Sequence, residues 1–160
     1  MFISVVIPTY NRISILRKCL DSLEKQILNC EIYNFEIVVV DDGSTDGTVG
    51  WLTNNFDSYP HLRLFEQSHG GPALGRNLGV EKSKGDLVVF IDSDLVVDRF
   101  FLQNHINSLL TAWKRLGNRK CFTYGSVINT NNFRNPSSEP FKLQDLSWAY
   151  FATGNVAIDR

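Results

Sequence analysis

Three short apolar runs, each followed by polar residues, limit the possible fold of this chain more than any other feature. They cover residues 3–7 (ISVVI), 35–40 (FEIVVV) and 87–91 (LVVFI). Because β-branched residues dominate and polar residues do not alternate with them, the runs are typical of strands buried on both faces of a parallel sheet. Residues 61–65 (HLRLF) do alternate, which predicts a further strand nearer an edge of the sheet.

Amphipathic patterns between these runs predict helices. An apolar stripe, a capping residue or a proline suited to the first turn marks each of them. In chain order the marker residues are Leu16, Leu20, Leu23 and Ile27, then Ser44 or Thr45 with Trp51 and Leu52, then Pro72 with Leu74 and Leu78, and last Asp98 with Leu102, Ile106, Leu109 and Trp113. Strand and helix alternate, so right-handed crossovers predict a three-layer α/β/α domain in which the three runs are parallel neighbours.

The C-terminal part of the sequence is less regular. Residues 121–127 and 150–158 are strand-like, the second with an interruption at Gly154 and Asn155, and residues 129–140 are predicted to form a loop. The sequence has no evident repeat or domain boundary, and 160 residues suit one hydrophobic core. We therefore expect a single domain over residues 1–160.

Composition excludes several classes of protein. The chain is 43% hydrophobic and 21% charged with a net charge of -1, as in a globular protein without a basic field for nucleic acid. Three cysteines without a CxxC motif predict reduced thiols rather than a disulfide framework or a metal cluster. No basic leader precedes the first apolar run, and the runs are too short for a bilayer. We expect the cytoplasm, either free or at the cytoplasmic face of the membrane.

A polar cluster follows each of the three runs: residues 8–11 (PTYN), Asp41 with Asp42, and residues 92–94 (DSD). The carboxyl ends of parallel strands share one edge of a sheet, where ligands bind. Two carboxylates about 4 Å apart repel by about 1 kcal/mol in water and about 4 kcal/mol at an effective dielectric near 20. A divalent cation would remove this repulsion and attract phosphate, and oxygen ligands suit Mg²⁺ or Mn²⁺.

Each motif on its own also has a purely structural interpretation. Aspartates are common in turns and helix caps, so a DxD triplet alone is weak evidence for a metal, and Asp46 and Asp98 fit the first turns of helices. Gly75 and Gly79 can simply allow close packing of a helix. The order of the motifs along the chain is more informative than any one of them.

Taken in order, four segments resemble the signatures of the large inverting glycosyltransferase family 2. They are residues 5–12 (VVIPTYNR), 36–48 (EIVVVDDGSTDGT), 70–79 (GGPALGRNLG) and 85–94 (GDLVVFIDSD), and together they span most of the chain. The resemblance implies a GT-A fold and a metal-dependent, inverting transfer of a sugar from a nucleoside-diphosphate donor. A UDP-sugar is the first choice of donor, and a glycan or lipid-linked hydroxyl the expected acceptor, as in cell-surface polysaccharide synthesis.

The resemblance also implies roles for individual residues. Pro8 and Tyr10 would line the base pocket, and one carboxylate of the Asp41-Asp42 pair would accept a hydrogen bond from N3–H of the base, with the choice between the two left open. The residues so placed at the nucleotide sugar are Pro8, Thr9, Tyr10, Asp41, Asp42, Arg76, Asn77, Asp92 and Ser93, with Asp92 and Asp94 at Mn²⁺ or Mg²⁺ and Gly154 and Asn155 on the acceptor side.

The family's general base lies in an acidic pair that the resemblance places beyond Arg160. We therefore expect no catalytic residue within this sequence, a fold that is incomplete at its C-terminal end, and nucleotide binding without efficient transfer. Asp145 and Asp159 are the last acidic residues, and neither stands in the family's context. Apolar residues near Tyr150 would then be uncovered, which predicts self-association, for example as a homodimer.

Two other functions fit part of the pattern. A nucleotidyltransferase-like enzyme also uses metal-held carboxylates on an α/β sheet, but it usually has a glycine-rich basic loop after the first strand, where this chain has residues 9–12 (TYNR). A non-catalytic nucleotide-sugar-binding or assembly domain would keep the donor site without turnover.

Overall fold

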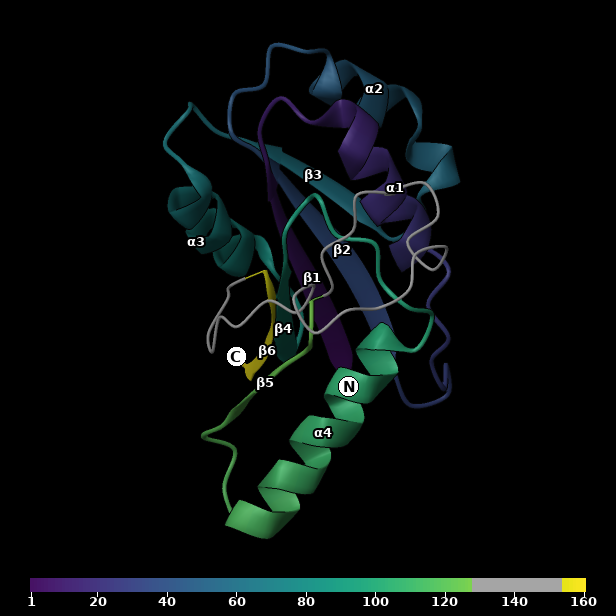
Figure 1. The fold of residues 1–160 in the computed structure, drawn as a ribbon, viewed down its shortest axis with the longest axis vertical. Helices are drawn as coiled ribbons and strands as arrows, with labels where there is room; N and C mark the ends of the chain where they lie inside the picture. Colours follow the sequence, from purple (N-terminus) through teal and green to yellow (C-terminus); the bar gives the residue numbers. More distant parts are fainter. Residues whose placement is uncertain (128–153) are drawn as a thin grey trace.

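A single sheet forms the centre of the molecule (Figure 1). The computed structural model describes residues 1–127 and 154–160, and within them the sheet has the strand order β3-β2-β1-β4-β6-β5. The strands are β1 (Phe2–Thr9), β2 (Asn34–Asp41), β3 (Leu62–Glu66), β4 (Leu87–Ile91), β5 (Phe122–Tyr124) and β6 (Asn155–Asp159). The first four are parallel, whereas β6 is antiparallel to both β4 and β5. The predicted parallel neighbours and the alternating edge strand are thus confirmed.

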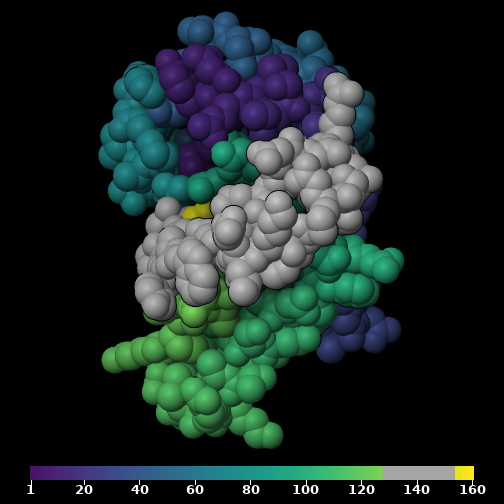
Figure 2. Space-filling model, viewed as in Figure 1, coloured from purple at the N-terminus to yellow at the C-terminus, as the bar shows by residue number. Residues whose placement is uncertain are grey.

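Helices cover both faces of this sheet, which confirms the predicted three layers (Figure 1). They are α1 (Ile13–Leu23), α2 (Thr48–Asn54), α3 (Pro72–Lys82) and α4 (Phe101–Leu116), with a short 3-10 helix, η1, at Phe56–Ser58. Alternate residues of β1 point to opposite faces, so Val5 packs in the core beneath α1, α2 and α4, while Val6 packs beneath α3. Along the length of the molecule, α2 and α4 lie at opposite ends (Figure 2).

Two glycines of helix α3 face the sheet and leave no room for a larger residue. A Cβ atom on Gly79 would overlap the side chain of Val6, and one on Gly75 would lie 3.1 Å from Cβ of Pro8. The two glycines therefore allow close packing, in agreement with their structural interpretation. Arg76 directly follows Gly75, which packs on Pro8 near the carboxyl end of β1.

Three predicted helix boundaries are wrong. Helix α1 ends at Leu23, and the side chain of Ile27 is exposed beyond it. The backbone N–H of Ile27 donates to the carbonyl of Arg99 and so takes no part in a helix. Neither Ser44 nor Thr45 caps α2, which begins at Thr48 after Gly47 in a left-handed conformation (φ 87°). Helix α4 begins at Phe101 rather than near Asp98, although Oδ1 of Asp98 accepts a hydrogen bond from the N–H of Phe100.

The first strand-like segment near the C-terminus is shorter than predicted, and the second is described only from residue 154 onward. Only residues 122–124 of the first one pair, as β5, and Asn155 begins β6 opposite Ile91 instead of interrupting a strand. The predicted loop at 129–140 and residues 145–153 lie outside the described residues. In the part that the structure describes, no helix combines the length and the apolar character needed to cross a bilayer.

Candidate functional site

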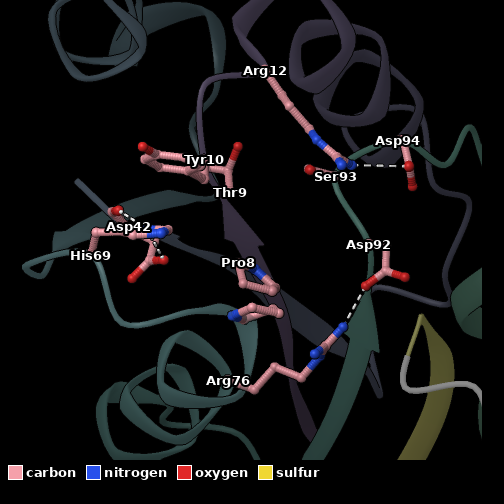
Figure 3. Close-up of a pocket in the computed structure, with 11 residues that line it drawn as sticks. Pro8, Thr9, Tyr10, Arg12, Asp42, His69, Arg76, Asp92, Ser93 and Asp94 are labelled. Carbon is pink, nitrogen blue, oxygen red and sulfur yellow. Dashed lines mark hydrogen bonds and ion pairs between the residues drawn. The ribbon is translucent and has the colours of Figure 1, made fainter. Parts of the chain in front are cut away.

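A hollow of about 430 Å³ opens beyond the carboxyl ends of β1 and β4 (Figure 3). In the sheet, β2 and β3 lie on one side of β1, and β4 lies on the other. The strand order therefore reverses between β1 and β4, and open α/β sheets bind ligands at such a topological switch point. The residues that line the hollow are Pro8, Thr9, Tyr10, Arg12, Asp42, His69, Pro72, Arg76, Asp92, Ser93 and Asp94. The predicted convergence of the three polar clusters at one edge is confirmed.

Most residues predicted at the nucleotide sugar line this hollow, but Asp41 and Asn77 do not. Strand alternation turns Asp41 away, toward the turn before α2, where its Oδ2 accepts the N–H of Ser44 at 2.8 Å. Asn77 lies exposed on α3. Asp42 therefore faces the hollow and Asp41 does not, a difference that the sequence had left open.

The turn after β1 owes its shape to Asn11. This residue has a positive φ of 49°, which asparagine tolerates better than most residues. Its backbone N–H donates to Oγ of Ser44 at 2.9 Å, and its Oδ1 accepts the N–H of Thr45 at 2.7 Å. These bonds tie the β1–α1 turn to the β2–α2 turn, and so fix the direction in which Tyr10 and Arg12 leave the strand.

Asp42 is buried and heavily hydrogen-bonded. Its Oδ1 accepts from Nε2 of Gln67 at 2.6 Å and from the N–H of Gly70 at 2.9 Å, and its Oδ2 accepts from the N–H of Gly71 at 2.8 Å. Burial alone would raise the pKa of Asp42, but these hydrogen bonds and the adjacent imidazole of His69 hold that pKa below its ordinary value. Asp42 is thus an ionised, acceptor-only group in the wall of the hollow.

His69, which the sequence prediction missed, contacts two predicted site residues. Its ring stacks on that of Tyr10, with centroids 4.1 Å apart and an interplanar angle of 25°. Its Nδ1 lies 2.8 Å from Oδ2 of Asp42 (Figure 3). The only sequence signal for His69 is its place directly before the Gly70-Gly71 pair, since a loop residue has no periodicity to reveal its direction.

Each aspartate of the DxD segment is paired with an arginine. Nη2 of Arg76 lies 2.5 Å from Oδ1 of Asp92, and Nη1 of Arg12 lies 3.0 Å from Oδ2 of Asp94 (Figure 3). The carboxylate repulsion that suggested a cation is thus relieved by arginines in this structure. The sequence prediction gave Arg12 no role, although it stands inside the first signature segment.

The side chains present fit a divalent cation that also binds phosphate. Among residues 1–127 and 154–160, no group of three or more His, Cys, Asp or Glu side chains could hold a metal alone. Mg²⁺, however, commonly takes only one or two protein carboxylates and completes its shell with water and substrate phosphates. Asp92 and Asp94 are both about half exposed in the hollow and offer the hard oxygen donors that such a cation prefers.

Gly154 and Asn155, predicted on the acceptor side, lie at the start of β6. The carbonyl of Gly154 accepts the N–H of Asp92 at 3.3 Å, and a Cβ atom there would overlap the carboxylate of Asp92. Asn155 is buried, and its Oδ1 accepts from Nε2 of His105 at 2.9 Å, while Nδ1 of His105 accepts from the hydroxyl of Thr123 at 2.8 Å. Gly154 thus contacts the DxD segment directly, whereas Asn155 joins β6 to α4. The contact of both residues with an acceptor stays a prediction.

Comparisons of the sequence and the structure with known proteins point to one family. Residues 4–158 match the family model described as Glycosyl transferase family 2. The poly(ribitol-phosphate) beta-glucosyltransferase of Bacillus spizizenii is 40% identical over 96 residues, which cover 59% of this chain and 15% of that protein. The chain spans less than half the length of the curated relatives that it matches.

Two solved structures share the arrangement of strands and helices. Staphylococcus aureus TarS 1-349 in complex with UDP-GlcNAc has a TM-score of 0.61 and 31% identity, over 71% of this chain and 32% of that chain. Mannosyltransferase PcManGT from Pyrobaculum calidifontis, in complex with GDP-Man and Mn²⁺, has a TM-score of 0.64 and 25% identity, over 99% of this chain and 44% of that chain.

Proposed function

Because the chain belongs to glycosyl transferase family 2 and has the GT-A fold of its structural neighbours, we propose that it binds a nucleoside-diphosphate sugar in the hollow and serves sugar transfer to an acceptor hydroxyl. One observation carries the proposal: an aromatic ring with an ionised carboxylate lies at one end of the hollow, and paired carboxylates and arginines lie at the other. The first pair suits a base, and the second set suits a diphosphate.

At the base end, Tyr10 offers a ring for stacking and Asp42 an acceptor. An ionised carboxylate only accepts hydrogen bonds, so it favours a base with a ring N–H, such as uracil or guanine, over cytosine, whose ring N3 is itself an acceptor. Asp42 is our choice over Asp41 because it faces the hollow. The neighbours in complex with UDP-GlcNAc and GDP-Man support this class of donor.

At the diphosphate end, Asp92 and Asp94 would hold Mn²⁺ or Mg²⁺. When bound, such a cation neutralises the diphosphate and acts as a Lewis acid on the leaving group. Arg76 and Arg12 line the same wall, so their guanidinium groups lie where they can also pair with phosphate oxygens. The neighbour that contains Mn²⁺ supports a divalent cation.

Inverting transfer needs a base that takes a proton from the acceptor hydroxyl. The carboxylates of the hollow are all paired in this structure, and a paired carboxylate is a poor base. Asp159 pairs with Leu87 in the sheet, at the far end of β4 from Asp92, and binds Arg119. We therefore propose that the base comes from outside the described residues.

Calorimetric titration tests the donor site. We expect UDP to bind in the presence of Mn²⁺ and to lose at least tenfold in affinity when EDTA replaces the metal or when Asp94 is changed to Ala. Asp57→Ala, an exposed change in η1 on another part of the surface, is the matched control and should bind normally. Equal affinity with and without EDTA would contradict the metal role, and CDP binding as tightly as UDP would contradict the role of Asp42.

Turnover is a separate measurement. Incubation of the protein with Mn²⁺, labelled nucleotide sugars and a panel of glycan and lipid-linked acceptors measures transfer directly. Formation of an inverted glycosidic bond supports the transferase, and the family match already disfavours a nucleotidyltransferase. Nucleotide binding without any transfer would instead support the non-catalytic binding domain.

A further inference from the structure

The ring of His69 makes the two contacts that the proposed donor site keeps for a base. It lies face to face on Tyr10 at 4.1 Å between centroids, and Nδ1 lies 2.8 Å from Oδ2 of Asp42 (Figure 3). Nδ1 makes its hydrogen bond to the backbone carbonyl of Asp42 at 3.2 Å. Because neither that carbonyl nor an ionised carboxylate can donate, Nδ1 carries the hydrogen. His69 thus presents a flat ring with an N–H to the same acceptor that would read a uracil or guanine ring.

While His69 is in place, its ring blocks the approach of a further donor to the carboxylate of Asp42. Its two oxygens accept three hydrogen bonds, from Gln67, Gly70 and Gly71, which leaves about one of the four lone-pair sites of a carboxylate. Nδ1 of His69 stands 2.8 Å from Oδ2, which leaves no room there for the donor atom of a ligand. The face of Tyr10 toward Asp42 is likewise covered by the imidazole. A base can therefore take both contacts only after His69 has left them.

We propose that His69 occupies the nucleobase position in the ligand-free chain and is displaced by the base of the nucleotide. This inference rests on the proposed function, because it needs a nucleotide in the hollow. His69 then determines specificity: a base must replace both the stack on Tyr10 and the polar contact with the Asp42 carboxylate, and only a ring with an N–H toward Asp42 replaces both. The phosphate groups do not compete with His69, so a ligand without a base can bind while the imidazole stays in place.

The local structure allows the side chain to move while the backbone stays. The side chain of His69 is 58% exposed, and it lies in the loop between β3 and α3. The backbone is held because Gly70 and Gly71 donate their N–H groups to Asp42, and the N–H of His69 lies close beneath Gly43. A rotation of the side chain alone therefore opens the base position, without rearrangement of α3.

The size of the effect follows from population arithmetic. If His69 fills the position for most of the time, the apparent dissociation constant rises by the reciprocal of the open fraction. One exposed aromatic pair with a hydrogen bond supports about a 2- to 10-fold excess of the closed form. Removal of the imidazole should tighten nucleotide binding by about that factor.

The test compares UDP with inorganic pyrophosphate by calorimetry, both with Mn²⁺, in the wild-type chain and in His69→Ala. We expect UDP to bind about 2- to 10-fold more tightly to His69→Ala, with pyrophosphate unchanged. The matched control is His61→Ala: His61 also stacks on an aromatic ring, Phe35 at 4.1 Å, and pairs with a carboxylate, Glu24 at 2.6 Å, but it lies outside the hollow. This control should change neither affinity.

A second measurement uses the wild-type chain alone. In NMR spectra of the histidine rings, UDP should move the His69 signals toward those of a free exposed histidine, whereas pyrophosphate should leave them in place. Weaker UDP binding in His69→Ala would overturn the inference, because His69 would then hold the base, and so would equal gains for UDP and pyrophosphate. If the folded chain bound pyrophosphate, but neither it nor any variant bound UDP, the proposed donor site itself would be refuted.

Discussion

Nη1 of Arg12 lies 3.0 Å from Oδ2 of Asp94, so the turn after β1 reaches across the hollow to the segment after β4. Both side chains are about half exposed, which makes the pair weak and exchangeable. A cation that arrives alone must compete with this guanidinium. A cation that arrives with a diphosphate brings negative charge that can pair with the released arginine.

We therefore predict opposite effects of Arg12→Ala on two ligands. Mn²⁺ alone should bind more tightly, by about two- to fivefold, because Asp94 has lost its partner. UDP with Mn²⁺ should bind more weakly, because a phosphate partner is lost. Electron paramagnetic resonance of free Mn²⁺ measures the first effect and calorimetry the second. Arg17→Ala, which removes a guanidinium stacked on Trp51 outside the hollow, is the control. Weaker Mn²⁺ binding in Arg12→Ala would refute the competition.

A substitution at Gly154, directly before β6, tests whether this residue supports the DxD segment. A Cβ atom there would overlap the carboxylate of Asp92, so Gly154→Ala should displace that side chain and reduce UDP–Mn²⁺ affinity at least tenfold. The control is Gly50→Ala, within α2, where a Cβ atom meets nothing within 4 Å and should raise stability by roughly 0.5–1 kcal/mol. Thermal unfolding checks both folds. Normal nucleotide affinity in a folded Gly154→Ala chain would contradict this support.

The parallel core and the shared edge of the polar clusters were predictable because both follow from runs of apolar residues. A run without alternation must be buried on both faces, and parallel strands end at the same edge. The same logic could not separate Asp41 from Asp42 by function. Alternation places them on opposite faces, but only the structure shows that the hollow lies on the side of Asp42.

The contacts of Arg12 and His69 were not predictable, because loop conformation sets them. Arg12 reaches Asp94 through a turn in which Asn11 has a positive φ, and His69 reaches Tyr10 through a loop whose Gly71 has a φ of 91°. Neither backbone state leaves a periodic pattern in the sequence. The end of α1 was missed for a related reason: the backbone of Ile27 bonds to Arg99, far along the chain.

We predict that His105 makes the stability of the fold depend on pH. Burial lowers the pKa of His105, outweighing the opposite effect of its hydrogen bond to Asn155. The unfolded chain therefore binds a proton near pH 6.5, where the folded chain does not, and stability falls as pH drops below that value, by at most about 1.4 kcal/mol per pH unit. The carboxylates with lowered pKa, such as Asp42, reduce the stability further only below about pH 4, where the unfolded chain begins to protonate them.

Urea unfolding at pH 7.5 and pH 5.5 measures this dependence. The wild-type chain should be less stable at the lower pH, and His105→Gln, which can still donate to Asn155, should lose most of the difference. His61→Gln, in the partly buried pair with Glu24, serves as the comparison for a histidine that is not fully buried. An unchanged pH difference in His105→Gln would show that another group is responsible.

Glu36 belongs to the second signature segment, yet it lies toward the opposite end of β2 from Asp42. It is 4% exposed and accepts hydrogen bonds at 2.6 Å from Oγ of Ser4, from Nη1 of Arg63 and from the N–H of Lys84. These bonds join β1, β2, β3 and the turn that begins β4. Burial alone would raise the pKa of Glu36, but the hydrogen bonds hold it below its ordinary value.

We predict that Glu36→Ala destabilises the fold strongly and leaves the donor site intact. Removal of a buried carboxylate leaves its partners unpaired, which typically costs about 3–5 kcal/mol, whereas Glu36→Gln keeps one acceptor oxygen and should cost less. Urea unfolding gives these values, and calorimetry with UDP and Mn²⁺ at low temperature should give wild-type affinity for whatever fraction is folded. The exposed neighbour change Glu31→Ala is the control for stability. A clear loss of UDP affinity in a folded Glu36→Gln chain would show that this end of β2 is coupled to the site, because the substitution touches nothing that lines the hollow.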